Sequence, residues 1–425
     1  MKLNYKRTIL VGFAFFLISA FWQAYDTIIP LILTNKFEMK QTWSGVIMSL
    51  DNIFAVFMLP FFGNLSDKAN TKFGKRTPFI VVGTILAVIF FTLLGFVNTP
   101  LVFILLLLGA LVSMAIFRSP AVALMPDVTV KPLRSKANAV INLMGTFGGI
   151  LILLFANVFH TSEEGKTDFR FYIIAVCAVM IVALVIFLLT VKEPLWVREM
   201  QEETERLGCD KETEERDATG GKLTKDQFTS LILILASVAL WYIGYNAVIS
   251  KYSVYATDFL KVNYANTLLI AQAAAIVSYI PVGLVASRIG RRKTILAGII
   301  MLFSAFFGAC FIREGTSALS MTLLFCLAGI GWATINVNSF PMVVELAKGS
   351  DVGKYTGYYY TASMAAQIVT PVVSGALMDW IGYESLFPYA AFFVAIAFVT
   401  MFFVKHGDAK PEAKVGIEAL DIQDD

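Results

Sequence analysis

Residues 63–76 read GNLSDKANTKFGKR, a basic polar loop between two long apolar runs. A related loop, GLVASRIGRR, follows at residues 283–292, so the first glycines of the two copies lie 220 residues apart. A second echo links the Pro120 to Asp127 region with the Pro341 to Glu345 region, where an apolar run ends in a carboxylate. Repeats of this kind are typical of membrane proteins built from two related halves. The sequence therefore predicts an internal duplication.

The composition excludes most soluble classes of protein. Of the 425 residues, 57% are hydrophobic and 15% are charged, and the mean hydropathy is +0.72. A soluble chain carries about 25% charged residues, so this chain has too little polar surface to cover itself in water. The net charge is +3 and the basic residues are dispersed, which argues against a nucleic-acid-binding surface. We expect the lipid bilayer to be the solvent.

Apolar runs long enough to cross a bilayer recur along the whole chain. A helix needs about 20 residues to span a hydrocarbon core about 30 Å thick. The sequence predicts an all-α integral membrane protein with twelve transmembrane helices. The predicted spans cover residues 8–33, 43–65, 78–97, 101–126, 136–159, 169–191, 228–251, 264–286, 294–312, 318–345, 355–379 and 386–404.

The placement of Lys and Arg sets the expected orientation. If the N-terminus is inside, 26 of the 34 basic residues fall in inner segments or at the adjoining span ends, 7 fall in outer loops or at the adjoining span ends, and Arg118 alone lies far from both ends of a span. Basic residues concentrate on the cytoplasmic side of membrane proteins. We therefore expect a multi-pass protein of the cell (plasma) membrane with both termini in the cytoplasm.

A charged gap divides the spans into two groups of six. The predicted parts are an N-terminal six-helix bundle over 1–191, a cytoplasmic charged linker over 192–227, a C-terminal six-helix bundle over 228–405 and a cytoplasmic tail over 406–425. Two interpretations of the linker stay open. It is either a solvated connection throughout, or it contains a short surface helix over 196–207 with Trp196 at the membrane interface.

Residues 63–76 also carry a family resemblance. Their G-x-x-x-D-K and G-K-R elements resemble the signature between the second and third helices of the major facilitator superfamily. The longer stretch GNLSDKANTKFGKRTPFIVVG resembles the glycoside–pentoside–hexuronide cation symporters, and most of all the branch of sucrose–proton symporters and their bacterial relatives. Further likeness lies in the segments Tyr255 to Phe259 and Ala123 to Asp127, and in Asn138.

The resemblance spans the whole chain and implies both a fold and an activity. The implied fold is two six-helix bundles related by pseudo-twofold symmetry. The implied activity is secondary active transport of a sugar, either a glucoside or a disaccharide, by alternating access with a coupling cation.

The signature loop is expected to act as a gate on the cytoplasmic side. Asp67 lies where a helix ends, which is unfavourable for an anion unless an arginine or a helix N-terminus faces it. We predict that Asp67 and Arg76 form a latch; the alternative is that the basic residues only fix the topology. In the second half Ser287 replaces the acid, so a matching latch there is expected to be weaker. The predicted gate residues are Gly63, Asp67, Lys68, Gly74, Lys75, Arg76, Asp127, Arg288, Arg291 and Glu345.

Three charged side chains are predicted inside the membrane: Asp26, Asp51 and Arg118. A charge at a helix centre costs about 2.5–3.5 kcal/mol on insertion scales, so each is a candidate functional group. The heights of Asp51 and Arg118 differ by about 6 Å, which an arginine side chain can reach. We assign proton coupling to these three residues, with the distance from Arg118 deciding whether the Asp51 carboxylate holds a proton. The alternative is a static ion pair that only orients helices.

Sodium coupling is a second alternative. In the melibiose-type carriers that the chain resembles, two acids on the second span bind the cation, and those positions hold Ala55 and Leu59 here. Their absence favours protons over Na⁺. The span 4 arginine of the plant symporters falls at Val122, one turn from Arg118, so a sugar-contacting role for Arg118 stays open. We expect no cofactor other than the coupling ion, and no metal site.

Amide and aromatic side chains within the spans suit a sugar ligand. Buried amides are costly unless they are hydrogen-bonded, so many of them in apolar runs indicate a wet cavity. Any single one could instead bridge two packed helices, and Trp or Tyr near a span end could be an interfacial anchor. Lys251 is expected to extend outward to the membrane surface. The predicted substrate-binding residues are Trp22, Gln23, Asn138, Asn142, Trp241, Tyr242, Asn246, Gln272, Asn336, Asn338, Tyr358 and Gln367.

The leading interpretation is a proton-coupled sugar symporter, and three other classes remain as alternatives. An efflux carrier for an amphipathic solute would need a greasier cavity with fewer amides. A membrane enzyme would need a nucleophile or metal constellation, and with two His and no HExxH or GxSxG pattern we do not expect one. A sugar sensor that binds without transporting is the third. The expected partners are a small-molecule sugar and the lipid bilayer, with no nucleic acid, and the protein is expected to be monomeric.

Overall fold

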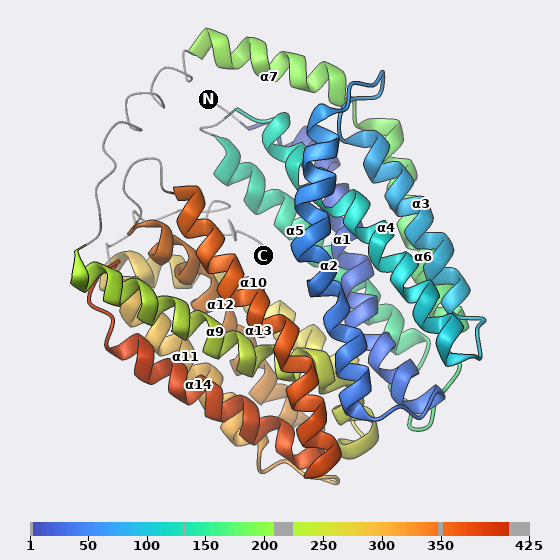
Figure 1. The fold of residues 1–425 in the computed structure, drawn as a ribbon, viewed down its shortest axis with the longest axis vertical. Helices are drawn as coiled ribbons and strands as arrows, with labels where there is room; N and C mark the ends of the chain where they lie inside the picture. The colour runs from blue at the N-terminus through green and yellow to red at the C-terminus, as the bar shows by residue number, and fades with distance from the viewer. Residues whose placement is uncertain (1–2, 131–132, 208–223, 347–351, 408–425) are drawn as a thin grey trace. The chain divides into compact units, whose positions relative to one another are not determined.

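The computed structural model describes residues 3–130, 133–207, 224–346 and 352–407, which form helices joined by short loops, with no strand in these ranges (Figure 1). In this part of the chain, eleven helices are long and apolar enough to cross a membrane. A further long helix, α10 (Tyr264–Ile289), lies over the predicted eighth span. The prediction of an all-α membrane protein is confirmed.

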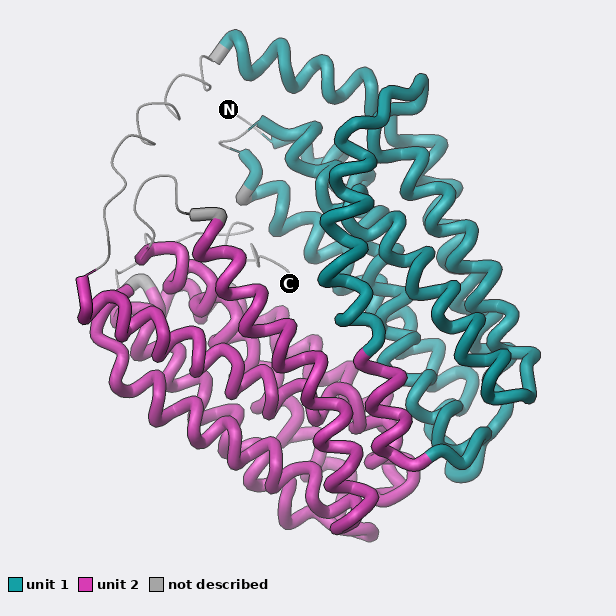
Figure 2. Tube along the Cα trace, in the orientation of Figure 1, with its two compact units in different colours: residues 1–39, 50–210 teal, residues 40–49, 211–425 magenta. Residues whose placement is uncertain are grey.

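The helices group into two compact units (Figure 2). Unit 1 contains Met1–Met39 and Leu50–Asp210, and unit 2 contains Lys40–Ser49 and Lys211–Asp425. Helices of unit 1 are α1 (Tyr5–Leu31), η1 (Ile32–Lys36), most of α2 (Gln41–Lys68), α3 (Thr77–Leu94), α4 (Pro100–Asp127), α5 (Arg134–Val158), α6 (Arg170–Thr190) and α7 (Glu193–Leu207). Helices of unit 2 are α9 (Lys225–Val254), η3 (Tyr255–Leu260), α10, α11 (Arg291–Ala309), α12 (Ala318–Val344), α13 (Val352–Trp380), η5 (Tyr383–Ser385) and α14 (Leu386–Phe402).

The predicted third and fourth spans, 78–97 and 101–126, separate at a proline. α3 ends at Leu94, and α4 begins at Pro100, its first helical residue. Proline suits this position because the first helical N–H has no intrahelical partner and the ring fixes φ near the helical value. The break keeps each helix at a length that can cross the bilayer.

Within unit 1, glycines allow close packing of helices. A Cβ at Gly145 of α5 would lie 2.7 Å from the Ser19 hydroxyl of α1, and one at Gly148 would lie 2.7 Å from the Phe16 carbonyl oxygen. The two helices are therefore in close contact at this pair of glycines. This contact fixes α1, which carries Asp26, against α5.

The internal duplication is visible in the packing of each unit. Gly83 of α3 approaches the Ser113 carbonyl oxygen of α4, and Gly298 of α11 approaches the Gly331 carbonyl oxygen of α12. The first long helix of each half also ends in π-helical turns, η1 after α1 and η3 after α9. Such segments are rare, so their recurrence at equivalent places supports a common origin for the halves.

Large apolar side chains cover much of the outer surface of the helices. Leu189 is 77% exposed and Val277 is 74% exposed, and both are on membrane-length helices. Monomeric soluble proteins rarely expose such continuous apolar surface. Because lipid tails are as apolar as these side chains, the bilayer is the solvent that this surface fits.

The predicted linker begins with a helix, α7, which lies across the end of unit 1 where α1 starts (Figure 1). Trp196 is 9% exposed, and the Arg7 guanidinium carbon lies 4.8 Å from its ring centroid. Arg7 also forms an ion pair with Glu199. The linker therefore begins with a helix, as the second interpretation predicted, and Trp196 packs under Arg7. The remainder of the linker at 208–223 and the tail from 408 onward lie outside the described residues.

Candidate functional site

Asp26 lies on α1 within a cluster of aromatic side chains. Tyr25 is fully buried, and Trp22 packs edge-on against it with ring centroids 5.2 Å apart. Trp22, Gln23 and Asp26 are half-buried. Because residues three and four apart share a face of a helix, Trp22 and Asp26 are on the same side of α1.

Arg118 of α4 joins this cluster in unit 1. Its guanidinium carbon lies 5.5 Å from the centroid of the Trp22 ring, within the range of a cation–π contact. The Arg118 guanidinium interacts electrostatically with the carboxylates of Asp26 and Asp51. The Asp51 carboxylate also interacts electrostatically with that of Asp26. The structure therefore brings together the three charged residues that the sequence singled out within the membrane.

The Asp51 carboxylate is oriented by its neighbour on α2. Asn52 donates to Asp51 Oδ1 from its backbone nitrogen at 2.6 Å and from Nδ2 at 2.8 Å. Two carboxylates and one guanidinium carry a net charge of −1 when all three are ionised. Uptake of a single proton makes the cluster neutral, which is the favoured state of a group removed from water.

Two predicted amides lie on α5, the helix that packs against α1. Asn142 is 5% exposed, and Asn138 lies one turn earlier and is half-buried. Their spacing puts both on one side of α5. Four of the predicted substrate-binding residues therefore lie on two helices of unit 1 that are in direct contact, namely Trp22 and Gln23 on α1 and Asn138 and Asn142 on α5.

An aromatic cluster lies between α9 and α12 in unit 2. Trp332 stacks on Tyr245 with ring centroids 3.6 Å apart and ring planes within 2° of parallel. Tyr242 meets the same indole edge-on at 5.2 Å. Trp332 was not among the predicted site residues, although its position one turn before Asn336 in an amide-bearing span was a usable signal.

The other predicted residues of unit 2 divide by environment. Trp241 and Tyr242 are buried, and Trp241 Nε1 and Tyr242 Oη have no hydrogen-bond partner within the described ranges. The side chain of Asn338 is buried and donates to the Thr334 carbonyl oxygen at 2.9 Å, and Asn246 donates to the Tyr242 carbonyl oxygen at 3.0 Å. These two amides stabilise their own helices.

The remaining predicted residues of unit 2 are more accessible. Gln272 on α10, Asn336 on α12 and Gln367 on α13 are half-buried, whereas Tyr358 is exposed beside Lys354.

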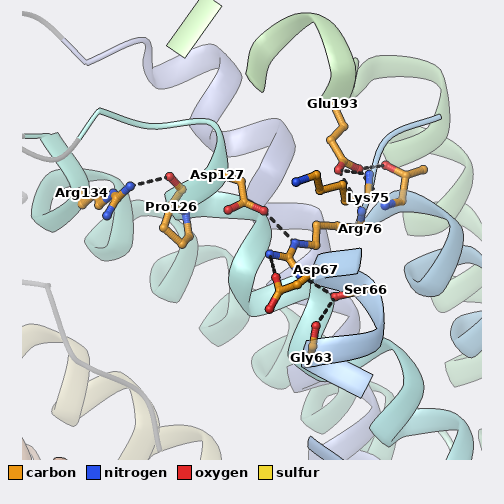
Figure 3. A network of polar contacts seen from close by, with 10 residues as sticks. Gly63, Ser66, Asp67, Lys75, Arg76, Pro126, Asp127, Arg134 and Glu193 are labelled. Atoms are coloured by element: carbon orange, nitrogen blue, oxygen red, sulfur yellow. Dashed lines mark hydrogen bonds and ion pairs between the residues drawn. The ribbon is translucent and has the colours of Figure 1, made fainter. Parts of the chain in front are cut away.

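Arg76 is the centre of a polar network in unit 1 (Figure 3). It donates to Ser66 Oγ at 2.5 Å and to Asp127 Oδ2 at 2.7 Å, and it pairs with Asp67 at 2.5 Å. Burial by itself would lower the pKa of Arg76, but the hydrogen bonds and charges of Asp127 and Asp67 outweigh it and raise the pKa. The predicted pairing of Asp67 with Arg76 is present, and Asp127 is a second partner.

Glu193 at the start of α7 holds the loop that carries Arg76. Its carboxylate accepts hydrogen bonds from the backbone nitrogens of Lys75, Arg76 and Thr77 at 2.6, 2.8 and 2.7 Å, and from Thr77 Oγ1 at 2.7 Å. These backbone nitrogens lie at the N-terminus of α3. A carboxylate there accepts hydrogen bonds from N–H groups that have no partner in the helix, and its negative charge interacts favourably with the helix dipole. Gly74, with φ +108°, leaves the space, because a Cβ there would lie 2.2 Å from Glu193 Cδ.

Replacing Glu193 by alanine should destabilise unit 1. The side chain is 2% exposed, so Glu193→Ala leaves three backbone N–H groups without their acceptor, at about 1–3 kcal/mol for each group that water cannot reach. We expect a lower thermal unfolding midpoint in detergent and faster amide hydrogen exchange at residues 75–77. Glu202→Ala on the same helix is the matched control, because Glu202 is in an exposed pair with Arg198. Equal midpoints for the two variants would contradict the capping role.

The second half contains a simpler pair at the equivalent place. Arg291 at the start of α11 pairs with Glu345 at the end of α12 at 2.5 Å. Arg288 is exposed at the end of α10. The ion pair repeats the contact of Arg76 with Asp127 in unit 1, which agrees with the sequence echo between the two halves.

Lys251 does not extend to the membrane surface, so that expectation is wrong. Its side chain is fully buried, and Nζ donates to the Gln41 carbonyl oxygen at 2.7 Å. The first turn of α2, which belongs to unit 2, covers it. The ammonium group finds its acceptors inside the protein, which removes the reason for it to reach outward.

A family model matches this chain over nearly its whole length, and the curated relatives match about a third of it. A family model described as MFS/sugar transport protein matches residues 10–394. The chain belongs to this family.

Among curated proteins, the MFS-type transporter ppzB of Metarhizium rileyi (strain RCEF 4871) is 27% identical over 135 residues, which is 32% of this chain and 27% of that protein. The ppzB protein of Metarhizium majus (strain ARSEF 297) is also 27% identical over 135 residues, and 29% of it is covered. The match therefore spans less than a third of each curated relative.

Solved structures of MFS transporters share the fold at low sequence identity. The inward-open xylose transporter XylE from E. coli gives a TM-score of 0.70 at 13% identity, covering 98% of this chain and 99% of that chain. The nucleoside transporter NupG gives 0.69 at 15% identity, covering 93% and 99%. A bacterial homologue of human Spinster gives 0.71 at 14% identity, covering 95% and 97%. These likenesses show that the fold is that of MFS transporters.

As a member of the MFS/sugar transport protein family, the chain is a multi-pass membrane transporter and not an enzyme. Sequence reasoning about this transporter missed Asn52, Glu193 and Trp332. The amide beside Asp51 was visible as an adjacent pair of polar residues within an apolar run. Glu193 offered no local signal, because its partners at 75–77 are more than 110 residues away.

Proposed function

We propose that this transporter is a proton-coupled symporter for a sugar, either a glucoside or a disaccharide, and that it works by alternating access. The cluster of Asp26, Asp51 and Arg118 inside unit 1 carries the proposal. We further propose that the protein acts as a monomer in the cell membrane with both termini in the cytoplasm, as the distribution of basic residues favours.

The charge state of the cluster is the proposed link between proton and sugar. One proton neutralises the net charge of the three ionised groups. A neutral cluster can pass through a state closed to water at less cost than a charged one, because burying an unpaired charge is expensive. The carrier would therefore switch readily between its outward-open and inward-open states when proton and sugar are both bound. Release of the proton into the cytoplasm would restore the negative cluster and favour release of the sugar.

A sugar is the proposed solute because amides and aromatic rings occur together on several helices. The rings of Tyr245 and Trp332 form a flat, half-buried stack. Flat aromatic surface suits the C–H faces of a pyranose ring, and amides suit its hydroxyl groups. Gln23, Asn142 and Gln272 are amides of this kind, placed on three different helices.

Uptake into proteoliposomes tests the proposal directly. Purified protein should accumulate a radiolabelled glucoside or disaccharide against its gradient when the outside is more acidic, and a protonophore should abolish the accumulation. Accumulation driven by a Na⁺ gradient at equal pH would instead favour the Na⁺-coupled glycoside symporter. Proton-driven export of amphipathic dyes without any sugar accumulation would favour an efflux carrier.

Removal of the indole from the aromatic stack should weaken sugar binding. Trp332→Ala removes the ring that stacks on Tyr245 and is proposed to contact the sugar, and an aromatic contact contributes about 0.5–1.5 kcal/mol beyond its buried area, so we expect Kd to rise about two- to tenfold. Isothermal titration of the transported sugar measures this. Trp380→Ala is the control, because Trp380 is 82% exposed at the end of α13. Equal Kd values for the two variants would remove Trp332 from the sugar site.

A further inference from the structure

The first turn of α2 is held by a carboxylate from another helix of unit 2. Asp379, near the end of α13, accepts hydrogen bonds from the backbone nitrogens of Gln41 and Thr42, both at 2.8 Å, and from Thr42 Oγ1 at 2.5 Å. A helix N-terminus has unpaired N–H groups and a partial positive charge, and a carboxylate satisfies both. Asp379 therefore acts as the N-terminal cap of α2 although it is more than 330 residues away.

A buried lysine holds the same turn from α9. Lys251 is fully buried, and Nζ donates to the Gln41 carbonyl oxygen at 2.7 Å and to Gln41 Oε1 at 3.3 Å. Gln41 in turn donates from Nε2 to Tyr383 Oη at 3.2 Å, and the charge of Asp379 acts on Lys251. A buried ammonium group is tolerated only when acceptors and a counter-charge are near it. Both are present here.

Direct backbone contact extends the attachment along α2. A Cβ at Gly45 would lie 1.9 Å from the Pro371 carbonyl oxygen of α13, and a Cβ at Gly375 would lie 2.2 Å from the Gln41 carbonyl oxygen. Neither position has space for any side chain. Small residues on both helices therefore bring α2 and α13 into backbone contact, as in other tightly packed membrane helices.

The attached part of α2 ends just before the coupling carboxylate. Residues Lys40–Ser49 belong to unit 2, and unit 1 resumes at Leu50. Asp51 is the second residue of α2 beyond this boundary. The helix continues without interruption from Gln41 to Lys68, so Asp51 lies on the same helix as the attached turns.

We propose that Lys251 and Asp379 are positioning residues of the transport cycle. They attach the first turns of α2 to α9 and α13, and this attachment sets where Asp51 lies relative to Asp26 and Arg118. The second half of this inference rests on the proposed coupling role of Asp51. The first half, the attachment itself, does not.

Cysteine labelling in a cysteine-free background tests the attachment. Ser44 is fully buried in the attached segment, so Ser44→Cys should react slowly with a membrane-impermeant maleimide. Adding Lys251→Met, which keeps the volume and removes the charged donor, should raise the labelling rate about tenfold. Lys261→Met is the matched control, because Lys261 is an exposed lysine directly after η3, the segment that follows α9. Equal rates with the two lysine substitutions would overturn the attachment.

The link to Asp51 needs a second readout. Lys251→Met should reduce proton-driven sugar accumulation about tenfold, whereas the Kd for sugar should change less than about twofold. Asp379→Asn should act in the same direction, and it replaces Lys251→Met if that variant does not fold. Faster labelling with unchanged accumulation would overturn the link to Asp51. Failure of the wild-type protein to accumulate sugar would contradict the proposed function and leave the labelling result intact.

Discussion

Exchange of Asp51 for asparagine should abolish uphill sugar accumulation and leave counterflow exchange partly intact. Asparagine keeps the shape and can still accept the hydrogen bonds from Asn52, but it cannot ionise. In Asp51→Asn the ionised Asp26 and Arg118 are already neutral together, so the cluster no longer needs a proton to become neutral. A pH difference of one unit is worth about 1.4 kcal/mol, or about tenfold accumulation, and the variant should lose all of it.

The control for Asp51→Asn is a carboxylate outside the membrane-spanning helices. Hydrogen bonds from Arg170 lower the pKa of Asp168 to about 2, so Asp168 stays ionised throughout the working pH range. Asp168→Asn should therefore leave the accumulation ratio unchanged. Both variants are measured in proteoliposomes with and without an imposed pH gradient. Wild-type accumulation by Asp51→Asn would remove Asp51 from the coupling mechanism.

Replacement of Arg76 should cause a large loss of stability in unit 1. The Arg76 side chain is 7% exposed and bonds Asp67, Asp127 and Ser66, so Arg76→Met leaves two carboxylates without their shared cation. Removal of one partner of a buried ion pair costs about 3–5 kcal/mol, and we expect the lower end because Asp67 is 60% exposed. The thermal unfolding midpoint in detergent should fall by several degrees. Arg76→Lys should give an intermediate loss, since an ammonium group lacks the planar fork that reaches several acceptors.

Lys75 provides the matched control for Arg76. It is the preceding residue, it carries the same charge, and its side chain is exposed. Lys75→Met removes one positive charge from the same loop without breaking the network, so its unfolding midpoint should change little. If the two methionine variants lost the same stability, the loop charge alone would be responsible and the network would not. That outcome would favour the topological interpretation of the signature loop.

Much of the fold was predictable because a hydrocarbon solvent imposes strict rules. The length of each apolar run and the breaks between runs placed the helices, and the break before Pro100 agrees with the proline rule for a first helical position. The pairing of Asp67 with Arg76 was also predictable, because an anion at the end of a helix needs a cation nearby. The outward orientation of Lys251 was wrong, because sequence gives the polarity of a side chain but not the acceptors that will surround it.

The sequence by itself determined that this protein is helical and spans the membrane in two related halves, because span length, charge placement and the repeated loop can be read directly from the chain, whereas its transport activity was implied by the family resemblance. Only the tertiary structure decided which distant groups meet. Glu193 caps α3, Asp379 caps α2, and Trp332 stacks on Tyr245. Each of these contacts joins helices that are far apart in sequence, and a local pattern cannot specify them, because the faces that meet are chosen by the packing of all the helices together.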